Sequence, residues 1–331
     1  MTAERTRNKW QPGIKVWLLM AVALLMVWGG FPLPFVEFLR GLVWAVALTL
    51  LVCQRNLITG VCTWLVAGLL LWRVTGEVSL VPAFLANGGL GLLYGHLFKT
   101  GVAPRKALGV GITFAIFAFL LIFFLASPSV AVVWHEWQAG LQASQGSVLD
   151  LYRQSGVLDL LARQGVSQET LSLYMNEVTG LLAGLLPSIM LLDIVLTAVL
   201  TYLAAYWVLR RFGIQVVALP PFREWQLPWY LIWGVICGLA FSLLGDYLKV
   251  KVLAVIGQNL VFGYLPWLVV TGLALIAYFD YFFSMALIFK LIFAVIVILN
   301  FPLMFTLVAL LGAFDPLVNF RRFINRTPKG G

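Results

Sequence analysis

The sequence predicts an all-α fold: a polytopic transmembrane helical bundle of 8 to 9 spans, with an outer amphipathic helical segment between spans five and six. Hydrophobic residues make up 62% of the 331 residues and charged residues only 11%, whereas a soluble domain has about 25% charged residues. The mean hydropathy is +0.99. Apolar runs longer than about 18 residues, enough to cross a bilayer, recur along nearly the whole chain. We therefore expect a single integral membrane domain over residues 1–331.

Nine apolar segments are candidate spans. The first lacks a small-residue cleavage site ahead of a polar mature chain, which favours an uncleaved first helix over an export signal. The boundaries of the last three are the least sharply defined. In chain order the segments are 14–30, 33–53, 57–74, 80–98, 107–133, 178–209, 229–248, 252–279 and 285–311.

Basic residues predict the orientation of these spans. They gather before the first span, at Arg55, at 99–106 and at 210–223, positions that lie an even number of spans apart. The positive-inside rule places all four in the cytoplasm, including the Pro/Trp-rich loop 212–228. Nine spans would then leave the basic C-terminal tail outside, against the same rule. Either the tail breaks the rule, or one candidate is a half-helix.

The segment 252–265 is the best candidate for such a half-helix. Gln258, Asn259 and Gly263 interrupt it just before Pro266, and we expect a break there beside a polar cavity that Asn87 or Asp246 also reaches. The alternative is a continuous helix whose amides bond to neighbouring spans.

Residues 134–177 are predicted to form an extracytoplasmic helical segment. Ser167 is a good N-cap, and the helix that follows it is expected to extend span six outward. Residues 148–161 have a weaker amphipathic pattern, which predicts a helix on the outer interface or over a cavity. The segment has more acidic than basic residues, namely Glu136, Asp150, Asp159, Glu169 and Glu177 against Arg153 and Arg163.

Signatures of enzymes and of metal or cofactor sites are missing from the sequence. The only histidines are His96 and His135, and no metalloprotease, phosphate-loop or serine-hydrolase motif is present. Asp193 and Asp246 are a very weak pair for an intramembrane aspartyl protease. We expect no catalytic residues, no cofactor and no metal. The formal charge of +9 comes from residues at span ends, so we expect no nucleic-acid partner.

Polar residues inside spans are the candidate ligand-binding residues. A charge near the bilayer centre costs roughly 2.5 to 3.5 kcal/mol, so such a residue is neutral, paired or beside water. Lys290 has the simpler explanation that it extends to a membrane face. The candidates are Asp193, Asn87, Asp246, Gln258 and Asn259.

Small residues and one loop are candidate contact surfaces. Gly234 and Gly238, like Gly91 and Gly95, repeat every four residues and allow close helix packing within the chain or docking of a partner. Loop 212–228 is either a stiff interfacial connector or a docking loop through Arg223 and Trp225.

Several short motifs together resemble the YybS-like family of bacterial integral membrane proteins of unknown function. They are Phe31 to Phe35, Gly88 to Gly95, the loop motif around Trp225, Asn259, and Leu311 to Asp315 followed by Phe320-Arg321-Arg322. Spans one to five are also distantly similar to the substrate-binding subunits of energy-coupling-factor transporters. The resemblance implies the bacterial cell (inner) membrane, an outward-facing ligand pocket and a coupling subunit as membrane protein partner. One departure is that Ala21 and Ala23 are not four residues apart, as the docking ridge of those subunits requires.

We therefore expect a non-enzymatic protein that contacts membrane lipid and binds or translocates a small molecule in a cavity of the bundle. The alternatives are a structural or regulatory scaffold for other membrane proteins and, third, a membrane-embedded enzyme. An unbroken span eight with both amides bonded inside the bundle would favour the scaffold.

Overall fold

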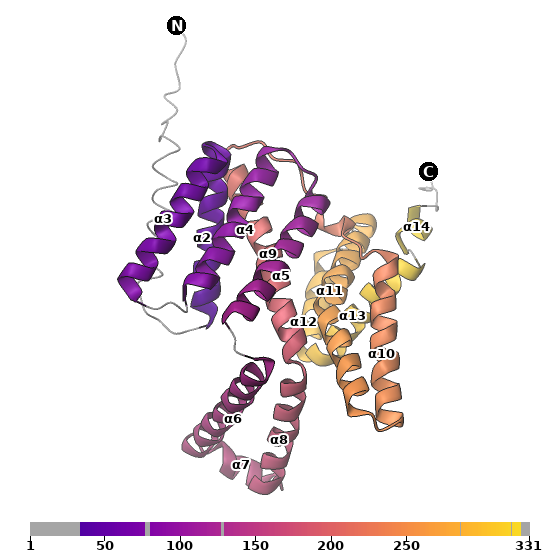
Figure 1. Ribbon diagram of the computed structural model, residues 1–331. Helices are drawn as coiled ribbons and strands as arrows, with labels where there is room; N and C mark the ends of the chain where they lie inside the picture. Colours follow the sequence, from indigo (N-terminus) through magenta and orange to yellow (C-terminus); the bar gives the residue numbers. More distant parts are fainter. Residues whose placement is uncertain (1–33, 77–79, 127–128, 285, 319, 326–331) are drawn as a thin grey trace, which may run out of the picture. The chain divides into compact units, whose positions relative to one another are not determined.

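The computed structural model describes residues 34–76, 80–126, 129–284, 286–318 and 320–325, and within them every extended regular element is a helix (Figure 1). The all-α class is thereby confirmed. The predicted first span, 14–30, lies outside the described residues. Five described helices are long and apolar enough to cross a membrane, and shorter apolar helices include Phe38–Gln54 and Leu57–Arg73. The exact number of spans stays a prediction.

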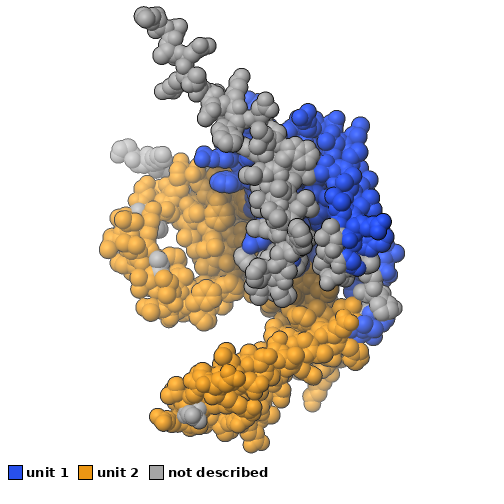
Figure 2. All heavy atoms as spheres, turned by 90° about the vertical axis from the view of Figure 1, so that its left-hand side faces the viewer, with its two compact units in different colours: residues 1–132, 191–219 blue, residues 133–190, 220–331 orange. Residues whose placement is uncertain are grey.

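Two compact units make up the chain (Figure 2). Unit 1 contains residues 1–132 and 191–219, and unit 2 contains residues 133–190 and 220–331. Each unit has its own cluster of buried apolar side chains. That residues 1–331 act as one membrane domain stays a prediction.

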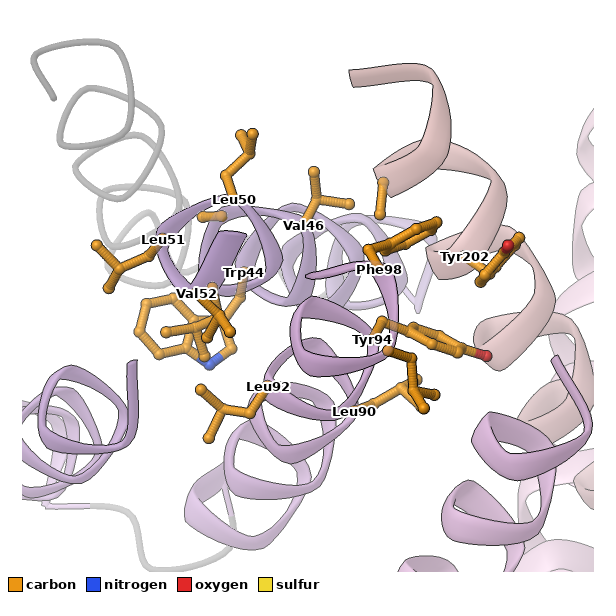
Figure 3. Close-up of a cluster of buried hydrophobic side chains, with 14 of the residues drawn as sticks. Trp44, Val46, Leu50, Leu51, Val52, Leu90, Leu92, Tyr94, Phe98 and Tyr202 are labelled. Atoms are coloured by element: carbon orange, nitrogen blue, oxygen red, sulfur yellow. The ribbon is translucent and has the colours of Figure 1, made fainter. Parts of the chain in front are cut away.

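Unit 1 is built from α2 (Pro34–Gln54), α3 (Leu57–Thr75), α4 (Leu80–Lys99), α5 (Pro104–Ala126) and most of α9 (Leu186–Arg211). In its core, Tyr94 of α4 meets Tyr202 of α9, and Phe98 stacks on the same ring at 4.8 Å (Figure 3). The Tyr94 hydroxyl donates to the Ala198 carbonyl oxygen at 2.9 Å. Gly91 brings α4 against the backbone of α2, as small-residue spacing predicts.

Polar side chains at helix ends bring the ends of α2 and α4 together in unit 1. The side chain of Asn56 caps the start of α3. Lys99, at the end of α4, donates to the carbonyl oxygen of Arg55 at 2.7 Å. The basic ends of α2 and α4 therefore lie together, and their position in the cytoplasm stays a prediction.

An outer hairpin, residues 130–184, consists of α6 (Val130–Gln154), α7 (Val157–Arg163) and α8 (Gln168–Gly184) (Figure 1). Ser167 caps α8 as predicted, accepting from the Thr170 amide. Gln145 of α6 bonds to Asn176 at 2.9 Å and to Thr179 at 3.3 Å, so α6 and α8 lie side by side. The hairpin begins at 130, so span five is shorter than the predicted 107–133. Its position outside the cytoplasm stays a prediction.

The remaining elements of unit 2 are η1 (Phe222–Glu224), η2 (Trp229–Leu231), α10 (Ile232–Tyr247), α11 (Lys251–Phe283), α12 (Leu287–Leu299), α13 (Phe301–Val318) and α14 (Phe320–Asn325). Gly234 faces the Tyr264 ring, and Gly238 faces Leu260 and Val261. The helices α10 and α11 are therefore antiparallel and in close contact. At Gly234 and Gly238 this favours packing within the chain, because α11 occupies the space beside them, and partner docking there stays a prediction.

Spans six, eight and nine also differ from the prediction. Span six is two helices that meet at Leu185, and the last span is two helices that meet at Asn300. In each case a proline, Pro187 or Pro302, lies two residues beyond the junction and has no N–H to continue the helix. The predicted break in span eight is wrong: α11 is continuous for 33 residues, about 50 Å, with Pro266 inside it.

Candidate functional site

The most deeply buried charges of unit 2 form a polar junction between the C-terminal helices and the loop before α10. Asp315, in α13, is 0% exposed and Arg321, in α14, is 9% exposed. An Arg321 Nη2 atom lies 3.2 Å from Asp315 Oδ2. Gln226, in the loop, donates to the same oxygen at 3.1 Å. One carboxylate oxygen thus joins α13, α14 and the loop.

Arg321 also holds the loop backbone. Its Nη1 donates to the Arg223 carbonyl oxygen at 2.6 Å and its Nη2 to the Trp225 carbonyl oxygen at 2.8 Å. The planar guanidinium presents several donors in a fixed fork, which suits two nearby acceptors. We call Arg223, Trp225, Gln226, Asp315 and Arg321 the loop junction.

Side chains of the loop reinforce this arrangement. The Arg223 guanidinium lies 3.8 Å from the centre of the Tyr281 ring, within cation–π range. The Trp225 indole donates to the Pro220 carbonyl oxygen at 3.1 Å. Arg223 and Trp225 therefore fix the loop, whereas Phe222 is 43% exposed. Partner docking at Arg223 and Trp225 stays a prediction.

Asn259, a predicted ligand residue, instead ties α11 to the α8–α9 bend. Its Nδ2 donates to the carbonyl oxygens of Gly184 at 2.7 Å and Val255 at 2.8 Å. Its Oδ1 accepts from the Ser188 amide at 3.0 Å, and the Ser188 hydroxyl lies 2.7 Å from it. These bonds satisfy the amide without a cavity, which is why α11 needs no break there.

The other predicted ligand residues do not form one site. Asn87 of unit 1 donates to Ala83 in its own helix at 3.0 Å, and its amide fills the space beside Gly41 of α2. Asp193, also in unit 1, is exposed. Asp246 and Gln258 belong to unit 2. Among the described residues, none forms a side-chain hydrogen bond or ion pair with Asp193, Asp246 or Gln258.

Lys290 has an ion-pair partner. Its Nζ lies 2.8 Å from an Asp280 carboxylate oxygen, with both side chains part-exposed. This pair fastens the start of α12 to the end of α11. The Asp280 carboxylate compensates the Lys290 charge, so the ammonium does not have to reach a membrane face to be stabilised. The ion pair and an extended Lys290 side chain are compatible with each other.

The loop junction contains residues that sequence reasoning did not select. Asp315 and Arg321 belong to two of the short motifs on which the family resemblance rests. Arg321 is otherwise one of the basic residues of the C-terminal tail. The available signal was an aspartate in an apolar run followed six residues later by an arginine. Within the described ranges, no group of three or more His, Cys, Asp or Glu side chains could hold a metal. The junction's contacts fasten α13, α14 and the loop to one another, although Asp315 Oδ1 and Arg321 Nε are buried without a hydrogen-bond partner among the described residues.

One protein family matches most of the chain. A family model described as "Predicted membrane protein (DUF2232)" matches residues 20–316. Neither the curated proteins nor the solved structures contain a match. The comparisons show no link to energy-coupling-factor transporters. With 297 of 331 residues matched (316 − 20 + 1), the chain belongs to the DUF2232 family of predicted membrane proteins.

Proposed function

We propose that this integral membrane protein is a non-enzymatic scaffold that binds other proteins at the membrane, and that loop 220–226 is one of its docking surfaces. The observation that carries the proposal is that buried polar side chains form their hydrogen bonds and ion pairs within this chain. Asn259, one of the predicted ligand residues, and the buried pair Asp315–Arg321 connect parts of this chain to one another. Groups that a ligand site would need are thus used for internal fastening.

The loop junction supports docking because it fixes a short segment without covering it. Arg321 binds the backbone of the segment, and Pro220 and Pro221 limit its conformations. The two prolines and Phe222 remain exposed. An ordered segment loses less conformational entropy on binding than a flexible one, so its exposed side chains can contribute more to affinity.

Photocross-linking in native membranes tests this proposal. A photoreactive amino acid at position 222 of the full chain should yield a protein adduct, and the same substitution at exposed Leu243 of α10 is the control. Arg321→Gln should release the loop and reduce the adduct, with protein abundance measured alongside. A position 222 adduct no stronger than the control, or one indifferent to Arg321→Gln, would contradict docking on this loop.

Small-molecule binding is the second candidate function, and Asp193 favours it. This exposed carboxylate lies in the long apolar helix α9, where an ionised, unpaired group facing lipid would be costly. A cationic or hydrogen-bonding ligand, translocated or held for a coupling subunit, would compensate that cost. Native mass spectrometry of the purified protein tests it: a bound small molecule lost in Asp193→Asn but kept in Asn259→Leu would favour this function over the scaffold.

A further inference from the structure

One face of α8 in the outer hairpin is apolar and uncovered. Leu173, Tyr174, Val178 and Leu181 are 64%, 62%, 54% and 51% exposed. At 100° per residue they fall, with Glu177, within one side of the helix. The opposite side contains Thr179, which bonds to Gln145 of α6. We call these five residues, 173, 174, 177, 178 and 181, the outer face of α8.

The outer hairpin differs in charge from the rest of the chain. Residues 130–184 contain five acidic and two basic residues, a net of −3 (2 − 5), in a chain of formal charge +9. Of the two basic residues, Arg153 pairs with Asp150 at 3.2 Å. The helix α8 contains Glu169 and Glu177 and no lysine or arginine. The outer face of α8 therefore combines apolar side chains with the carboxylate of Glu177, and Glu169 lies beside it.

The acidic residues of α8 favour a protein partner over a lipid surface or a second copy of this chain. Helices that lie on a lipid surface have polar faces rich in Lys and Arg, and an anionic bilayer would repel the carboxylates of α8. A second copy of the hairpin would bring like charges together, which is unfavourable. A protein surface with an apolar centre and basic surroundings would bury the exposed apolar side chains and pair with the carboxylates.

We propose that the outer face of α8 binds a partner protein through an apolar patch bordered by lysine or arginine. Leu173, Tyr174 and Leu181 supply the apolar contact, and Glu169 and Glu177 supply the charge that selects a basic partner. The surface is separate from the loop junction. The proposal extends the scaffold function and rests on it only in requiring a protein partner.

Photocross-linking from the full chain in native membranes tests the proposal. A photoreactive residue at position 173 should form a protein adduct, and one at exposed Ala143 of α6, which is outside the face, should not. The double substitution Glu169→Lys and Glu177→Lys should reduce the adduct by about tenfold, because it replaces two attractive charges with repulsive ones. Glu169→Gln with Glu177→Gln should give a smaller reduction, and the abundance of each variant is measured.

Each other outcome overturns the proposal in a recognisable way. Adducts with lipid alone would identify the face as a lipid contact, and adducts between two copies would identify a self-association surface. A protein adduct unaffected by charge reversal would exclude a basic partner, and no adduct above the Ala143 control would exclude docking. An adduct at position 222 without one at position 173 would refute this surface while leaving the loop proposal intact.

Discussion

Replacement of Arg321 by methionine should be among the most destabilising single substitutions in unit 2. Among the described residues it leaves the fully buried Asp315 carboxylate with Gln226 as its remaining donor, and it removes donors from two loop carbonyls. Breaking a buried ion pair by deleting one partner costs about 3 to 5 kcal/mol, chiefly because the other charge stays buried. We expect a loss of that size in the free energy of unfolding.

A double-mutant cycle separates the ion pair from simple packing. Asp315→Asn together with Arg321→Met removes both charges, so it should cost less than Arg321→Met alone, with a coupling energy of about 1 to 3 kcal/mol. Arg322→Met is the matched control, since Arg322 is exposed and an exposed charge contributes about 0 to 1 kcal/mol. Unfolding is measured in mixed detergent micelles for the wild type, Asp315→Asn, Arg321→Met, the double variant and the Arg322→Met control.

Limited proteolysis provides a local measurement of the same junction. Trypsin should cleave after Arg223 faster in Arg321→Met than in Arg322→Met, because the loop backbone has lost its two bonds to the guanidinium. Equal unfolding energies for the Arg321 and Arg322 variants, together with equal cleavage rates, would refute the view that Arg321 holds the loop.

Three further substitutions test packing inside the bundle. Asn259→Leu should lower the free energy of unfolding by about 1 to 3 kcal/mol, whereas Gln258→Leu should change it little. Equal effects would contradict the conclusion that Asn259 ties α11 to the α8–α9 bend. Gly312→Ala should destabilise because its Cβ would overlap a backbone oxygen of α11, while Gly180→Ala, which meets nothing within 4 Å, should be neutral or stabilising. Tyr94→Phe should cost about 0.5 to 1.5 kcal/mol through its lost hydrogen bond to α9, and unchanged thermal stability in detergent would argue against that bond.

Polar residues mark the helix ends that the sequence predicted correctly, and prolines inside apolar runs account for two that it missed. Apolar runs located α2, α3 and α4 to within about a turn, because these runs are bounded by polar or capping residues. Pro187 and Pro302 lie inside longer apolar runs, so hydropathy could not register the helix ends that they cause. Pro266 has the same chemistry, yet α11 continues through it. Packing of α11 against α10 and α13 supports the helix there, and such tertiary support is not readable from one sequence.

The candidate site was less predictable than the fold. Sequence reasoning singled out Asn259 as polar at membrane depth, but both a ligand site and a helix contact need such a residue, and only the geometry shows which carbonyls it meets. Asp315 and Arg321 are six residues apart and lie on separate helices, α13 and α14. Asp315 also accepts from Gln226, 89 residues away in the sequence, a contact that only the fold reveals.

The loop junction also bears on the side of the membrane that the C-terminus occupies. Arg321 contacts Arg223 and Trp225, so the end of α13 lies beside the loop that basic residues assign to the cytoplasm. The last predicted span is two helices, and α12, with 13 residues, is about 20 Å long, shorter than the hydrocarbon core of about 30 Å. We therefore predict that the chain enters the membrane in α12 and returns to the same side in α13. This arrangement would reconcile the span count with a basic cytoplasmic tail.

We accordingly predict a cytoplasmic C-terminus, which cysteine labelling can test in a cysteine-free background. Arg322→Cys should react with an impermeant thiol reagent only after the membrane is opened, whereas Ser147→Cys, exposed on the outer hairpin, should react in intact cells. Because Arg321 binds the loop directly, position 322 and the loop must share one side. Labelling of position 322 in intact cells would thus place the loop outside too, and the orientation drawn from Arg210, Arg211 and Arg223 would be wrong for unit 2.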